Sequence, residues 1–155
     1  MRIWQDEITL EKFSAVERAT AVEHCGLVLT ELGDDFLSGM LTVTAAVQQL
    51  DGTLHGGGSA VLAESLASLA ANGVVDRSRF ACLGQQINLA HLKPVPFGDT
   101  IKGTARPLGM DQHTQVWGVD IVNNSGELVC VSRVMMAVVP RPANAKAFLN
   151  GLSAS

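Results

Sequence analysis

Residues 49–68 read QLDGTLHGGGSAVLAESLAS, and this segment is the strongest indicator of the fold. Its second half is rich in Ala and Leu and contains no Pro, so we predict a helix from Ser59 to Asn72, with Gly73 as its C-cap. Residues 51–58 are rich in Gly and are predicted to form a loop. At 100° per residue, one face of this helix collects the large apolar side chains Leu62, Leu66 and Leu69.

Another face of the same helix consists of small residues and holds one carboxylate, that of Glu64. The small residues are Gly57, Ala60, Ala67, Ser68 and Ala71. A carboxylate in such a stripe must be paired, hydrogen-bonded or at the wall of a site. Ser68 follows Glu64 by four residues, which places the two side chains next to each other on the helix.

Three consecutive glycines, Gly56 to Gly58, precede the predicted helix and leave its N-terminal N–H groups uncovered. That end of a helix carries unpaired donors and partial positive charge. It suits a phosphate or the oxyanion that develops during acyl transfer. His55 directly precedes the glycines and is placed to donate a further hydrogen bond or to orient a water molecule.

The rest of the chain is predicted to be mainly strands. Helical spacing indicates a helix from Thr9 to Arg18, and Thr20 to Glu23 has the form of a capping box. The expected strands are residues 24–31, 36–44, 80–92, 100–108, 112–122 and 128–139, with a hairpin turn at 123–126. Strands on both sides of one apolar helix favour an α+β fold with an antiparallel sheet. We expect one domain over residues 1–140 and a C-terminal tail over 141–155.

Composition excludes several classes of function. The chain has 155 residues, enough for one domain, and a net charge of −4 with no basic stripe, which argues against a nucleic-acid partner. No segment has the length and apolarity of a membrane span or of a signal peptide. Three widely spaced cysteines form no disulfide framework, so we expect free thiols and a cytoplasmic location.

Two motifs suggest chemistry that the rest of the sequence does not support. His55 to Gly58 matches the oxyanion-hole string of lipase-like α/β-hydrolases, but the nucleophile elbow Gly-x-Ser-x-Gly is absent and the chain is too short. The four histidines are far apart and no metal-binding motif is present, so no metal is expected.

Taken singly, each residue of the central segment has an ordinary interpretation. A Glu on an Ala-rich helix is usually solvated or paired, and a His before glycines is usually a turn residue. Gln49 alone would be a surface residue, and Ser68 alone would pack against a neighbouring element. Only the combination of these residues at their spacing favours a functional site.

The segment 49–68 resembles the hotdog-fold thioesterases, and the likeness covers most of the chain. In particular, it resembles small bacterial acyl-CoA thioesterases such as the 1,4-dihydroxy-2-naphthoyl-CoA hydrolases and the proofreading thioesterases of enterobactin synthesis, a group that includes the PaaI-like proteins. The motif itself is Leu54 to Gly57 followed by Val61 to Ser65. Other matching segments are Ile3-Trp4, Gly84, Ile87-Asn88, His91, Gln115 to Trp117 and Ser132-Arg133.

This resemblance implies an antiparallel β-sheet wrapped around one long central α-helix. It also implies a homodimer whose sheets join edge to edge, with active sites that draw residues from both chains, and a homotetramer built from two dimers. The implied substrate is an acyl-CoA with an aromatic (hydroxybenzoyl- or naphthoyl-like) or medium-chain acyl group, and an acyl-carrier thioester is the alternative. Coenzyme A would be part of that substrate, and no separate cofactor is implied.

The resemblance also implies roles for individual residues. Glu64 would be the catalytic carboxylate, acting as a nucleophile or as a general base, and the Gly56 N–H would donate to the oxyanion. Gln49 and His55 would contact the thioester carbonyl or the leaving side, and Ser68 would place the water or the acyl group. The substrate-binding candidates are His91, Gly84, Asn88, Ser132 and Arg133.

Two other functions of the same fold compete with hydrolysis. A non-catalytic acyl-CoA-binding module would bind coenzyme A without turnover, although such a module has no need of Glu64 and His55. A hotdog dehydratase would also pair a His with an acidic residue. Its acid lies along a proline-containing stretch, which Gly56 to Glu64 lacks.

Overall fold

The computed structural model describes residues 1–5, 8–15 and 20–141. Within these ranges lie three helices and six strands: α1 (Leu10–Ala15), α2 (Ala21–Cys25), β1 (Val28–Leu32), β2 (Leu37–Thr42), α3 (Gly56–Val74), β3 (Phe80–His91), β4 (Thr100–Met110), β5 (Thr114–Val122) and β6 (Leu128–Pro140). The α+β class and the antiparallel sheet are therefore confirmed. The predicted end of the first helix at 16–18 and nearly all of the predicted tail lie outside the described residues.

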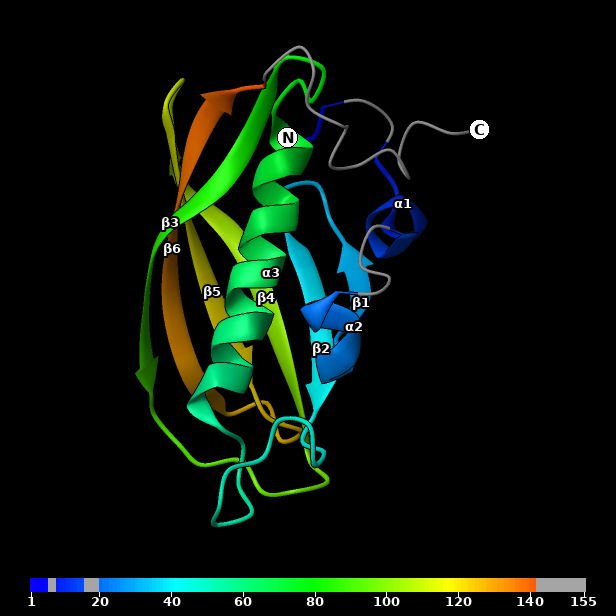
Figure 1. Ribbon diagram of the computed structural model, residues 1–155, viewed down its shortest axis with the longest axis vertical. Coiled ribbons are helices and arrows are strands. Elements are labelled where there is room, and N and C mark those ends of the chain that lie inside the picture. Colours follow the sequence, from blue (N-terminus) through cyan, green and yellow to red (C-terminus); the bar gives the residue numbers. More distant parts are fainter. Residues whose placement is uncertain (6–7, 16–19, 142–155) are drawn as a thin grey trace.

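The six strands form one antiparallel sheet in the order β1-β2-β4-β5-β6-β3, which curves around α3 (Figure 1). Alternation along β4 places Ile101, Gly103 and Ala105 toward the helix, where all three are buried. A β-carbon on Gly103 would lie 2.9 Å from the Leu66 side chain, so the glycine allows the helix to pack closely on the sheet.

The core lies between α3 and the concave face of the sheet. The apolar side chains of Leu62 and Leu66 are fully buried there, as their helical spacing predicts. The N-terminal segment closes one end of this core, because Trp4 stacks on Trp117 with ring centroids 6.5 Å apart. Trp4 also donates from Nε1 to the Gly33 carbonyl, at 2.7 Å.

The observed helix α3 is longer than predicted at both ends. It begins at Gly56, not at Ser59, so the glycines form the first helical turn and the loop is shorter than expected. Gly73 is not a C-cap but lies inside the helix, and Val75 is the C-cap. A β-carbon on Gly73 would lie 2.9 Å from Phe13 and 3.2 Å from Ile8, so this glycine leaves room for the N-terminal segment.

The predicted first strand also begins too early. The residues at 24 and 25 belong to α2, and β1 begins at Val28. Gly26 ends α2 in the left-handed conformation, with φ of 77°, and its N–H bonds to carbonyls of the last turn. The hairpin turn at 123–126 is confirmed: Gly126 has φ of 77° and Asn123 Oδ1 accepts from two backbone N–H groups.

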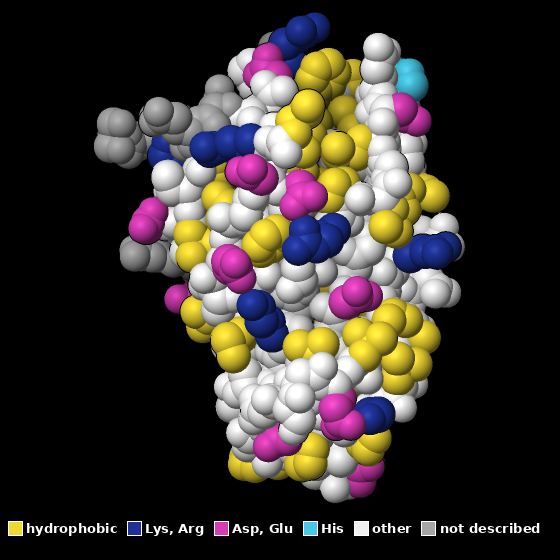
Figure 2. All heavy atoms as spheres, turned by 180° about the vertical axis from the view of Figure 1, so that it is seen from behind, with side chains coloured by type: hydrophobic (Ala, Val, Ile, Leu, Met, Phe, Trp, Pro, Cys, Tyr) yellow, Lys and Arg dark blue, Asp and Glu magenta, His cyan; other side chains and the backbone are white. Residues whose placement is uncertain are grey.

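Strand β3 is the edge of the sheet that matters for the candidate site. It pairs with β6 along one side, and no described strand pairs with its other side. Much of its length is exposed. The outer face of the sheet mixes hydrophobic and charged side chains, seen from behind in Figure 2, and carries the ion pairs Lys102–Glu31 and Arg106–Asp35. Among the described residues, no helix is both long and apolar enough to cross a membrane.

Candidate functional site

The N-terminus of α3 is organised by its cap residue, His55. The His55 backbone is extended, and its Nδ1 accepts a hydrogen bond of 2.8 Å from the Gly57 N–H. In a neutral imidazole, the nitrogen that does not accept carries the proton. His55 therefore presents an Nε2–H donor beside the first turn of the helix. Gly56, as the first helical residue, has an N–H with no acceptor inside the helix.

The last residue of β3, His91, packs against this helix end. A β-carbon on Gly56 would lie 3.0 Å from Nε2 of His91, so the absence of a side chain at Gly56 makes the contact possible. His91 belongs to the inner face of β3 and pairs with Cys130 of β6. The structure thus brings His91 against Gly56, although the two residues are far apart in the sequence.

The loop before α3 is held by an Asp-Gly-Thr turn. Asp51 Oδ1 accepts from the Thr53 N–H at 3.0 Å and from the Thr53 hydroxyl at 2.7 Å. Gly52 makes the turn with φ of 79°. These bonds hold the pKa of Asp51 below its usual value, the hydroxyl bond of Thr53 being the largest cause. Gln49 joins the turn because its side-chain nitrogen donates to Thr53 Oγ1 at 2.8 Å.

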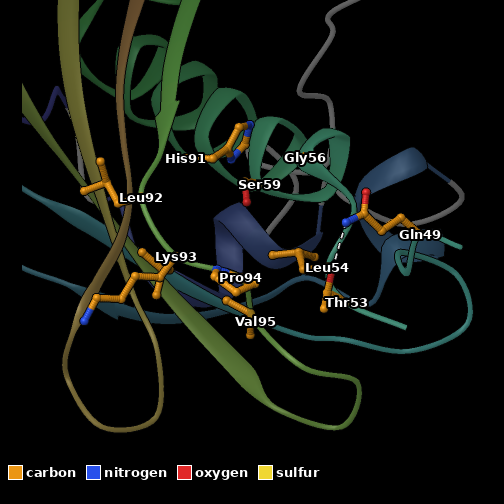
Figure 3. A pocket seen from close by; sticks show the side chains of 11 residues that line it. Gln49, Thr53, Leu54, Gly56, Ser59, His91, Leu92, Lys93, Pro94 and Val95 are labelled. Atoms are coloured by element: carbon orange, nitrogen blue, oxygen red, sulfur yellow. Dashed lines mark hydrogen bonds between the residues drawn. The ribbon is translucent and has the colours of Figure 1, made fainter. Parts of the chain in front are cut away.

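A pocket of about 410 Å³ opens between the start of α3, this loop and the end of β3 (Figure 3). Its polar side chains are those of Gln49, Thr53, Ser59, His91 and Lys93, and Gly56 contributes to its wall. Leu54, Leu92, Pro94, Val95 and Val129 supply apolar wall. Sequence reasoning did not single out Ser59 or Lys93, and only the tertiary structure brings Lys93 to this place.

Glu64 lies farther along α3 and does not line this pocket. Its carboxylate rests against Gly84 of β3, where a β-carbon would lie 2.7 Å from Oε1. The pairing of β3 with β6 shifts register between Gly84 and Gln86, as at a β-bulge. Glu64 follows Gly56 by eight positions in the helix, which corresponds to roughly 12 Å along the axis. One chain therefore holds two parts of a site, one beside Gly84 within β3 and the other at His91, the last residue of that strand.

The other predicted site residues lie on α3 and on strands β3 and β6. Ser68 is half-buried one turn beyond Glu64. Ser132 is buried and pairs with the core residue Val119. Asn88 and Arg133 pair with each other and line a separate outer-face pocket of about 550 Å³. The structure does not bring these last two together with Glu64.

The metal-binding side chains and the cysteine thiols bear on which chemistry the site can perform. Within the described ranges, no three His, Cys, Asp or Glu residues are placed to hold a metal ion. Cys82 and Cys130 are buried, and burial raises the pKa of both thiols, that of Cys82 to about 11.

Comparison with known proteins identifies the family. The model of the thioesterase superfamily matches residues 51–130. A predicted esterase of Vibrio cholerae is 40% identical over 147 residues, which cover 94% of this chain and 97% of the relative. The proofreading thioesterase EntH of Cronobacter sakazakii is 36% identical over 137 residues, which cover 88% of this chain and 98% of EntH. The crystal structure of a mutant thioesterase from Pseudomonas aeruginosa superposes with a TM-score of 0.87 at 31% identity, over 90% of this chain and 99% of that one.

The chain therefore belongs to the thioesterase superfamily and has its hotdog fold. It is a hydrolase that acts on acyl thioesters. The resemblance inferred from residues 49–68 is confirmed.

Proposed function

We propose that the protein hydrolyses an acyl-CoA whose acyl group is aromatic, hydroxybenzoyl- or naphthoyl-like, or of medium chain length. The observation that carries this proposal is the pocket at the N-terminus of α3, where Gly56 and His91 meet. A thioester carbonyl oxygen placed there would accept from the Gly56 N–H. A donor aimed at the developing oxyanion is typically worth about 2.7–4 kcal/mol of barrier.

His55 assists the same carbonyl or the leaving sulfur. Its Nδ1 is occupied by the Gly57 N–H, so Nε2 is the nitrogen left to donate. The apolar part of the pocket wall, which includes Leu54 and Val95, suits a largely apolar acyl group or the hydrocarbon part of a pantetheine arm. Coenzyme A then enters only as part of the substrate, and no resident cofactor is proposed.

Glu64 is proposed as the reacting carboxylate, either as a nucleophile on the thioester carbon or as a general base on water. A positioned general base typically contributes about 10²–10⁴-fold to the rate. Within one chain Glu64 is too far along α3 to reach a thioester at Gly56. The site is therefore complete only if a second copy supplies one of its halves.

The unpaired edge of β3 supports a dimer that does this. On the inner face of β3, Gly84 lies against Glu64 and His91, the last residue of the strand, lies against Gly56. If two copies of β3 pair antiparallel about a two-fold axis at Asn88, His91 of one chain faces the Gly84–Gln86 bulge of the other. Glu64 of each chain then faces Gly56 of its partner. Pairing of two such dimers into a homotetramer stays a prediction.

The test is thiol release from benzoyl-, hydroxybenzoyl-, phenylacetyl- and medium-chain acyl-CoAs by the purified protein. Glu64→Gln removes the charge with little change of shape, and Glu31→Gln is the matched control, because Glu31 is an exposed carboxylate paired with Lys102. We expect release by the wild type and by Glu31→Gln, and a loss of about 10²-fold or more in Glu64→Gln. Equal rates in all three proteins would remove Glu64 from the mechanism. Binding of coenzyme A without release would indicate a binding module.

A further inference from the structure

The side chains of Asp51, Thr53 and Gln49 form a short hydrogen-bonded chain at the mouth of the pocket. Asp51 Oδ1 lies 2.7 Å from Thr53 Oγ1, and Thr53 Oγ1 lies 2.8 Å from Gln49 Nε2. Gln49 Nε2 also lies 3.3 Å from Asp51 Oδ2. Figure 3 shows the Gln49 nitrogen directed at Thr53 and the amide oxygen turned away from it.

The chemistry of these groups sets the direction of each bond. An ionised carboxylate only accepts, so the Thr53 hydroxyl must give its single hydrogen to Asp51. The hydroxyl oxygen is then left as an acceptor, and the group that faces it must be the Gln49 NH₂ rather than its carbonyl. The second hydrogen of that NH₂ is directed at Asp51 Oδ2. Both donors of the Gln49 amide are therefore engaged within the turn.

We propose that Asp51 and Thr53 are positioning residues that present the side-chain oxygen of Gln49, and not its NH₂ group, to the pocket. Gln49 then acts as a hydrogen-bond acceptor during thioester hydrolysis. This rests on the proposed function and differs from the role that the resemblance implies for Gln49, namely contact with the thioester carbonyl or the leaving side. A carbonyl oxygen and a thioester sulfur have no hydrogen to donate. We assign the acceptor to the attacking water, whose O–H it would orient.

A second turn in the same chain supplies an internal comparison. Asp76 Oδ1 accepts from the Ser78 N–H at 3.0 Å and from the Ser78 hydroxyl at 2.6 Å, the same pattern as at Asp51 and Thr53. Asp76 lies just after the C-terminus of α3, at the opposite end of the helix from the pocket. These two hydrogen bonds by themselves therefore only stabilise a turn and do not indicate a functional site. What differs at Asp51 is that the hydroxyl also holds a residue of the pocket wall.

The kinetic test compares Thr53→Val, which removes the hydroxyl at nearly constant shape, with Thr53→Ser, which keeps it. Ser78→Ala is the matched control, because it removes the corresponding hydroxyl from the second turn. We expect kcat to fall about three- to tenfold in Thr53→Val with little change in KM. Thr53→Ser should restore kcat to within about twofold of the wild type, and Ser78→Ala should leave it unchanged.

A double-mutant cycle separates positioning from a general structural effect. In a Gln49→Ala background, Thr53→Val should cause no further loss, because the group that it positions is gone. An equally large loss in that background, or wild-type kcat in Thr53→Val, would overturn the proposal. A rise in KM at unchanged kcat would overturn the assignment to the attacking water.

A spectroscopic test does not depend on turnover. In ¹⁵N-labelled protein, the two Gln49 side-chain amide protons should exchange slowly with solvent in the wild type and in Ser78→Ala, and rapidly in Thr53→Val. Rapid exchange in the wild type would show that the amide is not held. If the wild type releases no thiol from any substrate, the proposed function fails. Slow exchange of the Gln49 amide in that same protein would still establish its orientation.

Discussion

A β-carbon on Gly84 would lie 2.7 Å from Oε1 of Glu64, closer than any side chain can approach without displacing the carboxylate. The register of β3 against β6 also shifts between Gly84 and Gln86, as at a β-bulge, beside the Glu64 carboxylate. Strand β3 therefore shapes the space around Glu64 even though Glu64 is a residue of the helix.

This contact predicts that Gly84→Ala lowers kcat while the protein stays folded. The added methyl group would push the Glu64 side chain away from its position, and we expect a loss of about tenfold or more. Gly109→Ala is the matched control, because a β-carbon at Gly109, also in a strand, would meet nothing within 4 Å. Thiol release and thermal unfolding of both variants provide the measurement. Wild-type kcat in Gly84→Ala would show that the carboxylate has no required position there.

The proposed dimer predicts that Asn88→Cys forms a disulfide across the two-fold axis. Residues that face each other in an antiparallel pair have Cα atoms about 4.5–5.5 Å apart, within the range of a disulfide. Mild oxidation should convert the variant to a covalent dimer on a non-reducing gel. Ala90→Cys, on the same strand and also exposed, is the control and should cross-link poorly, because it is not opposite itself in this register. Efficient cross-linking at Ala90 alone would contradict the register.

The buried amide of Asn72 predicts a large loss of stability when it is removed. Asn72 donates to the Ser68 and Cys82 carbonyls and accepts from the Cys82 N–H, at 2.9, 3.0 and 2.9 Å. Asn72→Leu would leave the backbone groups of Cys82 without partners, at a cost of about 1–3 kcal/mol for each unsatisfied group. Urea unfolding measures the free energy of unfolding. Gln112→Ala, at an exposed amide, should change it by no more than about 0.5 kcal/mol.

The thiol of Cys82 predicts a loss of stability at alkaline pH. Burial raises its pKa from 9.0 to about 11, so the folded state keeps the thiol proton at a pH where the unfolded chain releases it. The stabilisation is complete below pH 9 and is lost progressively as the pH rises through 9 toward 11. Cys82→Ala should unfold with a smaller pH dependence in this window than the wild type. Identical pH dependence in both proteins would show that Cys82 does not contribute.

Much of the fold follows from local patterns in the sequence. The apolar face of Leu62 and Leu66 predicted the central helix, and residues 100–108 were predicted to be a strand, which the structure has as β4. The hairpin at 123–126 followed from turn chemistry alone. Glycines were harder to interpret: Gly73 resembled a helix cap, but Trp4, Ile8 and Phe13 pack on it from a segment distant in sequence.

The central segment was enough to indicate the family and to name His55, Gly56 and Glu64 as candidates, because their spacing along a helix is a local property. Only the tertiary structure decided where these groups lie relative to residues far along the chain. It placed His91 against Gly56, Gly84 against Glu64, and Asn88 with Arg133 on the outer face. It also oriented the Gln49 amide through Thr53. Strand register and hydrogen-bond direction depend on which groups come into contact after folding, and no local pattern of residues specifies those contacts.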